Sequence, residues 1–151
     1  MDIRVDNLQN PLVVALLGAH LVDMAEHSPP ESVHALDLEA LKAPNVTFWT
    51  AWQADVLLGC GALQETSLSE GEIKSMRTSP KHLRKGVAAN ILERLIEEAR
   101  KRNYSCVNLE TGSADAFKAA RLLYERYGFE YCEPFNNYTK DSHSLFMQLT
   151  L

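Results

Sequence analysis

A run of basic residues followed by a glycine is the first feature of the sequence that could do chemistry. From Lys74 to Lys85 the chain carries five Lys or Arg residues and no acidic residue, although its overall net charge is −5. Gly86 then precedes a segment with the apolar spacing of an amphipathic helix. The free backbone N–H groups of a helix N-terminus attract anions, and Arg84 and Lys85 would add side-chain charge. This arrangement predicts a pyrophosphate site, with a solvated basic loop as the plain alternative.

The histidines near the N-terminus are a second set of candidate ligands. His20, His27 and His34 recur at intervals of seven residues, which could suggest a metal site. The Ser-Pro-Pro segment 28–30 breaks any helix between the second and third histidine, so the three need not share a face. No acidic or cysteine ligands accompany them at metal-ligand spacing, and we therefore expect no metal.

The segments around the basic loop must fold so as to present it. The spacing of apolar residues and of Pro and Gly predicts helices over 11–27, 37–42, 87–102 and 114–127, and strands over 2–6, 46–53, 56–65, 72–78, 106–111, 129–132 and 144–151. The alternation in the last segment predicts a strand with one buried face. This order of elements favours an α/β (α+β) fold, a mixed sheet with helices on both faces.

Length and composition are those of one globular domain. The 151 residues are 46% hydrophobic and 23% charged, which is enough apolar material for a core without disulfides or metals. We therefore expect a single domain over residues 1–151. Fifteen basic against twenty acidic residues argue against general nucleic-acid binding, although the basic loop keeps a nucleic-acid-associated module as an alternative.

The cysteines and the most apolar run of the sequence indicate the cellular compartment of the protein. Cys60, Cys106 and Cys132 are an odd number without a Cys-x-x-Cys pair, which excludes a complete disulfide framework and a zinc ribbon and fits buried thiols. The apolar run 12–19 is too short to cross a bilayer, which needs about 20 residues. Acidic residues precede it where a secretion signal has basic ones, so we expect a cytoplasmic protein without a membrane segment.

Two segments resemble the signatures of a known family. The stretch Met76-Arg-Thr-Ser-Pro-Lys-His-Leu-Arg-Lys-Gly-Val-Ala-Ala resembles the acetyl-CoA pyrophosphate loop of the GNAT N-acetyltransferase superfamily. The stretch Ala120-Arg-Leu-Leu-Tyr-Glu-Arg-Tyr-Gly-Phe resembles its second signature, a helix that ends in Tyr-x-x-x-Gly-Phe. Both occur in the superfamily's order, and the resemblance covers residues 46–133. Within the superfamily the chain is most similar to small bacterial acetyltransferases of the YsnE type, which implies a mixed, mostly antiparallel central sheet.

The resemblance implies that acetyl-CoA is the cosubstrate. The backbone groups of Met76 and Thr78 would bind its pantetheine arm. The pyrophosphate would lie against Arg84, Lys85, Gly86, Val87 and Ala88. Two positions beside the cofactor depart from the family pattern: Leu83 stands where Arg or Gln is usual, and Phe117 where a CoA-contacting Asn is frequent. These departures remove side-chain contacts and leave the backbone cradle.

Acetyl transfer to nitrogen needs a base that frees the attacking amine and an acid that protonates the departing thiolate. The resemblance implies that Tyr124 is the acid. Glu72, on the strand beside the cofactor groove, is the first candidate base, and Glu110 is the second; a water relay is a further alternative. The plain alternatives are that Glu72 is a solvent-facing carboxylate at a strand end and that Tyr124 is a core aromatic.

The family places its first two helices around the acceptor, which implies that His20, His27 and His34 line the acceptor pocket. Glu110 follows the strand region where substrates enter in this family, which makes it a further candidate for that pocket. We therefore predict an N-acetyltransferase that moves acetyl from acetyl-CoA to a primary amine by direct attack on the thioester. A CoA-binding or sensing module with the same fold and no turnover is the alternative. The acceptor stays open, and a homodimer is the commonest assembly for such a chain.

Overall fold

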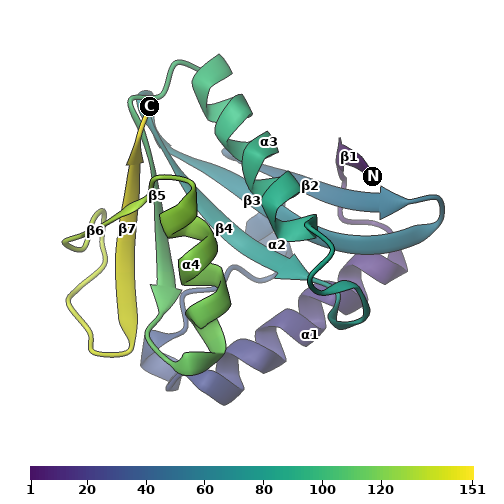
Figure 1. Cartoon of the computed structure of the whole chain (residues 1–151), viewed down its shortest axis with the longest axis horizontal. Helices are drawn as coiled ribbons and strands as arrows, with labels where there is room; N and C mark the ends of the chain where they lie inside the picture. The colour runs from purple at the N-terminus through teal and green to yellow at the C-terminus, as the bar shows by residue number, and fades with distance from the viewer.

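The computed structural model describes residues 1–151, whose strands form one seven-stranded sheet in the order β1-β2-β3-β4-β5-β7-β6 (Figure 1). The strands are β1 (Asp2–Val5), β2 (Val46–Gln53), β3 (Val56–Ser67), β4 (Glu70–Thr78), β5 (Cys106–Gly112), β6 (Glu130–Cys132) and β7 (Ser144–Thr150). Only β4 and β5 pair in parallel, and all other neighbours are antiparallel. The predicted mixed, mostly antiparallel sheet is confirmed.

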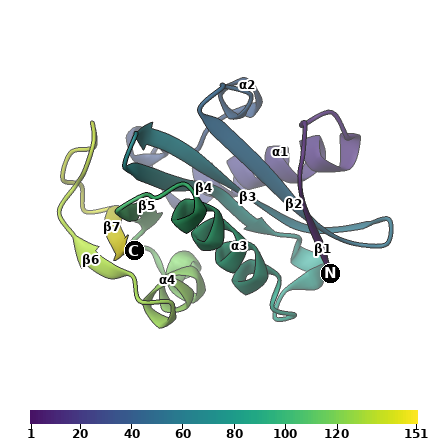
Figure 2. The same ribbon diagram turned by 90° about the horizontal axis from the view of Figure 1, so that it is seen from above.

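Helices cover both faces of the sheet, as predicted (Figure 2). On one face lie α1 (Pro11–His27) and α2 (Leu38–Leu41), and on the other lie α3 (Val87–Lys101) and α4 (Lys118–Arg126). No helix combines the length and the apolar character needed to cross a lipid bilayer.

The apolar spacing of α3 accounts for its place on the sheet. Its buried residues recur every three or four positions and are Val87, Ile91, Leu92, Leu95, Ile96 and Ala99. They belong to one core cluster with Trp49, Leu63 and Leu109 of the sheet. Burial of each large apolar side chain is worth about 1.5–3 kcal/mol, so this face fixes where the N-terminus of α3 lies relative to β4.

The parallel pairing of β4 with β5 is short. It runs from Glu70 opposite Cys106 to Ile73 opposite Leu109 and ends there, although both strands continue. Just beyond, Ser75 has a φ of 56° at a break in the register between β4 and β3. Such a bulge bends a strand. The facing edges of β4 and β5 therefore part, and their backbone groups are left without strand partners.

Two segments differ from their predictions. The helix expected over 114–127 is divided into a 3-10 turn at Asp115–Phe117 and α4, which Gly128 ends with a φ of 94°. In β7, Met147 is buried as the alternation predicts, but Phe146 on the opposite face is buried as well. The prediction of one buried face is wrong because the segment between β6 and β7 folds back over the sheet. There the ring of Phe135 packs edge-on against that of Phe146, with 5.6 Å between ring centroids.

Candidate active site

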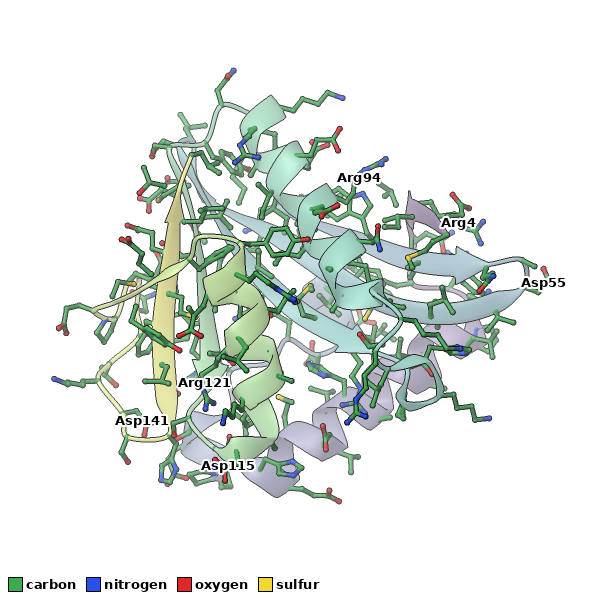
Figure 3. The ribbon with its side chains drawn as sticks, viewed as in Figure 1. Arg4, Asp55, Arg94, Asp115, Arg121 and Asp141 are labelled. Carbon is green, nitrogen blue, oxygen red and sulfur yellow. The ribbon has the colours of Figure 1, made fainter.

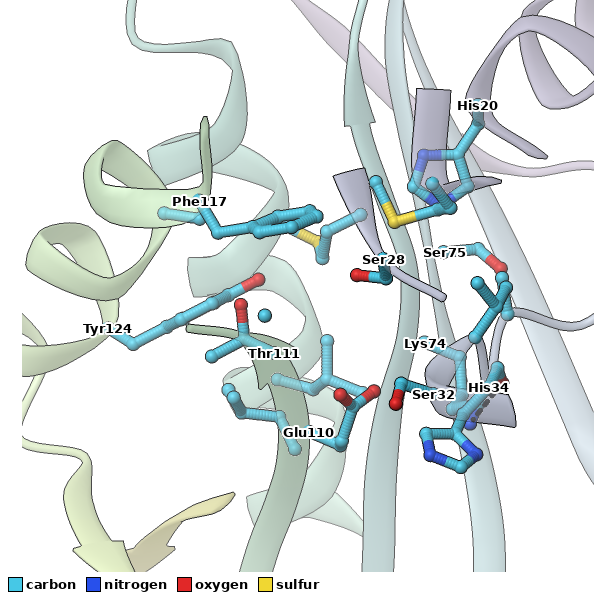
Figure 4. Close-up of a pocket in the computed structure, with 18 residues that line it drawn as sticks. His20, Ser28, Ser32, His34, Lys74, Ser75, Glu110, Thr111, Phe117 and Tyr124 are labelled. Atoms are coloured by element: carbon cyan, nitrogen blue, oxygen red, sulfur yellow. Dashed lines mark hydrogen bonds between the residues drawn. The ribbon is translucent and has the colours of Figure 1, made fainter. Parts of the chain in front are cut away.

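A cavity of about 120 Å³ lies where β4 and β5 part (Figure 4). Its walls come from α1, the segment 28–35, β4, β5, the 3-10 turn before α4 and α4 itself. Nine of its 18 lining residues are hydrophobic. The cavity can therefore hold an apolar chain against one part of its wall and a polar reacting group against the other.

Tyr124 reaches the cavity from α4. Its side chain is buried, and its hydroxyl points into the cavity near Thr111 (Figure 4). Burial, with the nearby carboxylate of Glu110, raises the pKa of the Tyr124 phenol, so the hydroxyl stays protonated at neutral pH. The ring also packs on Phe129, with 5.7 Å between ring centroids. Tyr124 is thus part of the core and presents a proton donor to the cavity.

Glu110 enters from β5, as the first residue after the pairing with β4 ends. Its carboxyl group points into the cavity toward Ser32 (Figure 4). Burial raises the pKa of Glu110 above the ordinary carboxyl value, and the charge of Lys74 acts in the opposite direction. A carboxylate with a raised pKa is a stronger base, which suits the removal of a proton from a substrate.

Glu72 lies elsewhere. It is only 3% exposed, so the alternative of a solvent-facing carboxylate at a strand end is wrong. Its carboxylate accepts hydrogen bonds from Tyr138 Oη at 2.6 Å, Lys74 Nζ at 3.1 Å and Asn136 Nδ2 at 3.4 Å. It does not line the cavity that holds Glu110 and Tyr124, but a neighbouring one.

Two of the five basic residues do not belong to the expected basic loop. Lys74 Nζ is buried and donates to the backbone oxygen of His34 at 3.1 Å, as well as to Glu72 and to Tyr138. Arg77 forms a 2.7 Å ion pair with Asp23 of α1. On a regular strand, residues three apart point to opposite faces, but the bulge at Ser75 inserts one residue between these two. Both side chains therefore point toward α1 and the segment after it rather than toward α3. The charge left for an anion comes from Lys81, Arg84 and Lys85, all exposed.

The loop before α3 has the backbone expected of an anion site. Arg84 and Gly86 both have positive φ, at 62° and 79°, and no side chain caps the helix. The first hydrogen bond of the helix joins Asn90 N to Gly86 O at 3.0 Å. The N–H groups of the preceding turn, which include Val87 and Ala88, are therefore free to meet a phosphate.

Of the other residues expected beside the cofactor, some line the cavity and others lie outside it. Met76 lines the cavity, and Thr78 is the last residue of β4 before the loop. Phe117 also lines the cavity, and its ring leaves so little room that a Cβ on Gly112 would lie 2.2 Å from it. Leu83 is 58% exposed on the loop. An apolar side chain there gives a phosphate no donor, so the loop depends on its backbone and its basic neighbours.

The three histidines separate in space. His20 is buried and lines the cavity, and burial together with the charge of Arg77 lowers its pKa to about 4. His34 also lines the cavity, whereas the exposed His27 does not. The structure therefore brings His20 and His34 to the cavity, whereas His27, the last residue of α1, lies exposed at the end of the helix.

One exposed group could hold a metal ion. Asp23, Glu26 and His27 of α1 have ligand atoms within 4.8 Å of one another. However, Asp23 already pairs with Arg77, and Nδ1 of His27 lies 2.9 Å from the backbone oxygen of Asp23. The group is better described as a polar cluster at the end of α1.

Some lining residues carry no sequence signal. Ser28, Ser32 and Val33 form a wall of the cavity although their segment reads only as a helix stop. The Ser32 hydroxyl donates to the carboxylate of Asp141, from the other end of the chain. Thr111 follows Glu110 on β5, and its place beside Tyr124 depends on how α4 packs. Such tertiary neighbours have no spacing that a sequence pattern could reveal.

Comparison with known proteins agrees with this geometry. The profile of the acetyltransferase (GNAT) family matches residues 15–129. The chain is 56% identical to the uncharacterized N-acetyltransferase YsnE of Bacillus subtilis (strain 168), over 97% of each chain. It is 46% identical to the uncharacterized N-acetyltransferase YedL of Escherichia coli (strain K12), over 99% of this chain and 94% of that one.

Solved structures show the same fold. A crystal structure of an acyl-CoA N-acyltransferase from Klebsiella pneumoniae superposes with a TM-score of 0.80 at 26% identity, covering 99% of this chain and 97% of that one. A GNAT family acetyltransferase from Elizabethkingia anophelis, solved with acetyl-CoA bound, gives a TM-score of 0.69 at 18% identity, with 99% and 97% covered. With the family profile matching most of its length and a relative more than half identical, the chain belongs to the GNAT acetyltransferase family.

Proposed function

We propose that this N-acetyltransferase moves the acetyl group of acetyl-CoA to a primary amine by direct attack of the amine on the thioester. Its family makes the chain an N-acetyltransferase, and acetyl-CoA is its acetyl donor. One observation carries the finer proposal. Glu110 and Tyr124, a carboxyl group with a raised pKa and a protonated phenol, line one small cavity between β4 and β5.

The donor would lie along the free edge of β4. Beyond Ile73 that edge has no partner on β5, so backbone groups between residues 74 and 78 can hydrogen-bond the pantetheine arm. The first turn of α3 follows, with free N–H groups and the exposed Arg84 and Lys85 for the pyrophosphate. In this arrangement the thioester end of the cosubstrate would reach the cavity.

Proton transfers then complete the reaction. Glu110, directly or through one water, takes a proton from the ammonium group of the acceptor, and the freed nitrogen attacks the carbonyl carbon of the thioester. The new C–N bond forms and the C–S bond breaks. The nitrogen releases its second proton to solvent, which gives the neutral amide, and the leaving thiolate takes the proton of Tyr124. The proton on Glu110 returns to the Tyr124 phenolate through solvent, so the enzyme ends as it began.

Glu110 rather than Glu72 is the base in this proposal. The Glu72 carboxylate accepts three hydrogen bonds and lies outside the cavity, so it cannot approach an amine there without breaking them. Glu110 is on the cavity wall. A base must first be within reach of the proton that it removes, and only then does its pKa matter.

A thiol-release assay tests the proposal. The protein is incubated with acetyl-CoA and a panel of amines, and CoA release is compared with release in the absence of amine. We expect amine-dependent release and an N-acetylated product in a single turnover. Tight binding of acetyl-CoA without any acetylated amine would instead identify a CoA-binding module with the same fold.

A further inference from the structure

Two buried polar atoms in the wall of the cavity have no hydrogen-bond partner in the protein. They are Nδ1 of His20 and the hydroxyl oxygen of Ser75. The large majority of buried polar side-chain atoms in folded proteins are paired, and an unpaired one costs free energy. Nothing in the proposed reaction uses these two side chains. Unpaired groups on a cavity wall point to a polar ligand group that the cavity binds.

His20 and Ser75 form the wall where α1 faces β4. They are 6% and 8% exposed, and both lie across the cavity from Tyr124 (Figure 4). Ser75 stands at the bulge of β4 with a φ of 56°, a conformation that residues other than glycine rarely adopt. Strained backbone of this kind concentrates at binding and active sites. The wall therefore has the burial and the backbone of a binding surface.

The charge of Arg77 acts on this wall, although Arg77 does not itself line the cavity. Its Nη1 atom pairs with Asp23 at 2.7 Å, while its buried Nε–H group has no partner. Burial lowers the pKa of His20, and Arg77 lowers it further by more than Asp23 raises it. The positive charge thus outweighs the negative one at the imidazole ring. An anionic ligand group is favoured there and an ammonium group is disfavoured.

Both wall groups can donate a hydrogen bond to the same ligand. A serine hydroxyl donates through its O–H, and a neutral imidazole donates through one of its ring nitrogens. A carboxylate only accepts and has about four lone-pair sites on its two oxygens, so it can take both hydrogen bonds. A carboxamide would accept them too but would gain less from the charge of Arg77. An alkyl group would leave His20 and Ser75 unpaired.

We propose that His20 and Ser75 bind a carboxylate of the acceptor, and that the acceptor is therefore a small amino acid. The inference rests on the proposed function, since it takes the amine beside Glu110 as the reacting group. The cavity of about 120 Å³ has room for a small molecule only. This names the acceptor class as an amine that carries its own carboxylate, rather than an alkylamine, a polyamine or the N-terminus of a protein.

Three amino acids and their amides test the proposal. Glycine, β-alanine and γ-aminobutyrate place the carboxylate at increasing distances from the amine, and each is compared with the primary amide of the same length. We expect kcat/KM for at least one amino acid to exceed that for its amide by about tenfold or more, as for a hydrogen bond to a charged group. The amides hold a larger share of free amine at neutral pH, so ionisation of the amine cannot produce this preference.

Two variants locate the effect. Ser75→Ala removes the hydroxyl and keeps the backbone, and Arg77→Gln leaves the charge of Asp23 uncompensated. Each should lower the ratio of kcat/KM for the amino acid to that for its amide by about threefold or more. The matched controls are Ser67→Ala, at the exposed end of β3, and Arg94→Gln, on the exposed side of α3 (Figure 3), which should keep the natural ratio. Amides turned over as well as amino acids at all three lengths, or a ratio unchanged in both variants, would overturn the inference and leave the proposed function standing.

Binding without turnover gives an independent readout. The rise in Tm that each compound produces in the presence of CoA needs no catalysis. A larger rise with an amino acid than with its amide, reduced in Ser75→Ala, supports the carboxylate site even if no amine is acetylated, a result that would count against the proposed function alone. Equal rises for amino acid and amide at all three lengths would overturn the inference, whether or not the amines are acetylated.

Discussion

Lys74 Nζ donates a 2.8 Å hydrogen bond to Tyr138 Oη, although the two residues lie 64 positions apart in the sequence. The same hydroxyl donates to Glu72 at 2.6 Å. The segment between β6 and β7 is thereby joined to β4 at the point where β4 leaves β5. This link covers one face of β7 and forms a wall of the neighbouring cavity that Glu72 lines.

Loss of the Tyr138 hydroxyl should destabilise the protein. In Tyr138→Phe, the buried Glu72 and Lys74 each lose a partner, which should lower the free energy of unfolding by about 1–3 kcal/mol in urea denaturation. Tyr131→Phe changes an exposed phenol and should stay within about 0.5 kcal/mol of the natural protein. Equal effects of the two variants would show that the buried cluster contributes no stability.

Tyr124→Phe should separate catalysis from packing. The ring and its contact with Phe129 remain, so Tm and acetyl-CoA affinity should change little, while turnover falls by about tenfold to a thousandfold. A thiolate with a pKa of about 8.5 leaves unaided at high pH, so the defect should shrink toward pH ~9. A lower Tm with an unchanged rate per folded molecule would make Tyr124 a core residue only.

The pH dependence of kcat/KM should report the ionisation of Glu110. As a base it acts only when deprotonated, and its pKa is raised by burial, so kcat/KM should rise with pH through an inflection above the ordinary carboxyl range. Glu110→Gln should lose this inflection and about a hundredfold or more in kcat. Glu72→Gln should keep the inflection, and its loss there instead would assign the base to Glu72.

Acid should destabilise the protein through His20. The unfolded histidine titrates near pH 6.5 but the folded one at about 4, so the unfolded chain binds more protons between these values. Stability is therefore lost as pH falls through this window, by about 3 kcal/mol for the full shift. Urea denaturation of His20→Gln should show a weaker pH dependence, whereas His27→Gln, at an exposed position, should follow the natural protein.

Gly86 should matter to CoA binding more than a single lysine beside it. Its φ of 79° strains any β-branched residue, so Gly86→Val should weaken CoA binding in calorimetry more than Lys85→Ala does. The strain comes from the backbone rather than from crowding, because an added Cβ would meet only Asn90, at 3.5 Å.

Two comparisons complete the Gly86 test. Gly18→Val, in open space on α1, should leave CoA affinity unchanged. CoA should bind far more tightly than pantetheine, which lacks the phosphates, and equal binding of both would contradict an anion site before α3.

Local patterns in the sequence determined most of the fold. The apolar spacing of α3, Pro11 at the start of α1 and Gly128 at the end of α4 each act within a few residues, so they can be read without tertiary structure. The loop before α3 belongs to the same class, because its glycine and its helix N-terminus are adjacent in the chain.

Only the tertiary structure decided the roles of the charged groups. Lys74 and Arg77 belong to one basic run in the sequence, but in the structure they pair with Glu72 and Asp23. The sequence also favoured Glu72 over Glu110 as the catalytic base. Whether a carboxylate faces a cavity or three hydrogen-bond donors depends on where β4 and β5 part and on how a segment 64 residues away folds back. Burial and charge pairing are sums over neighbours in space, and sequence spacing records only neighbours along the chain.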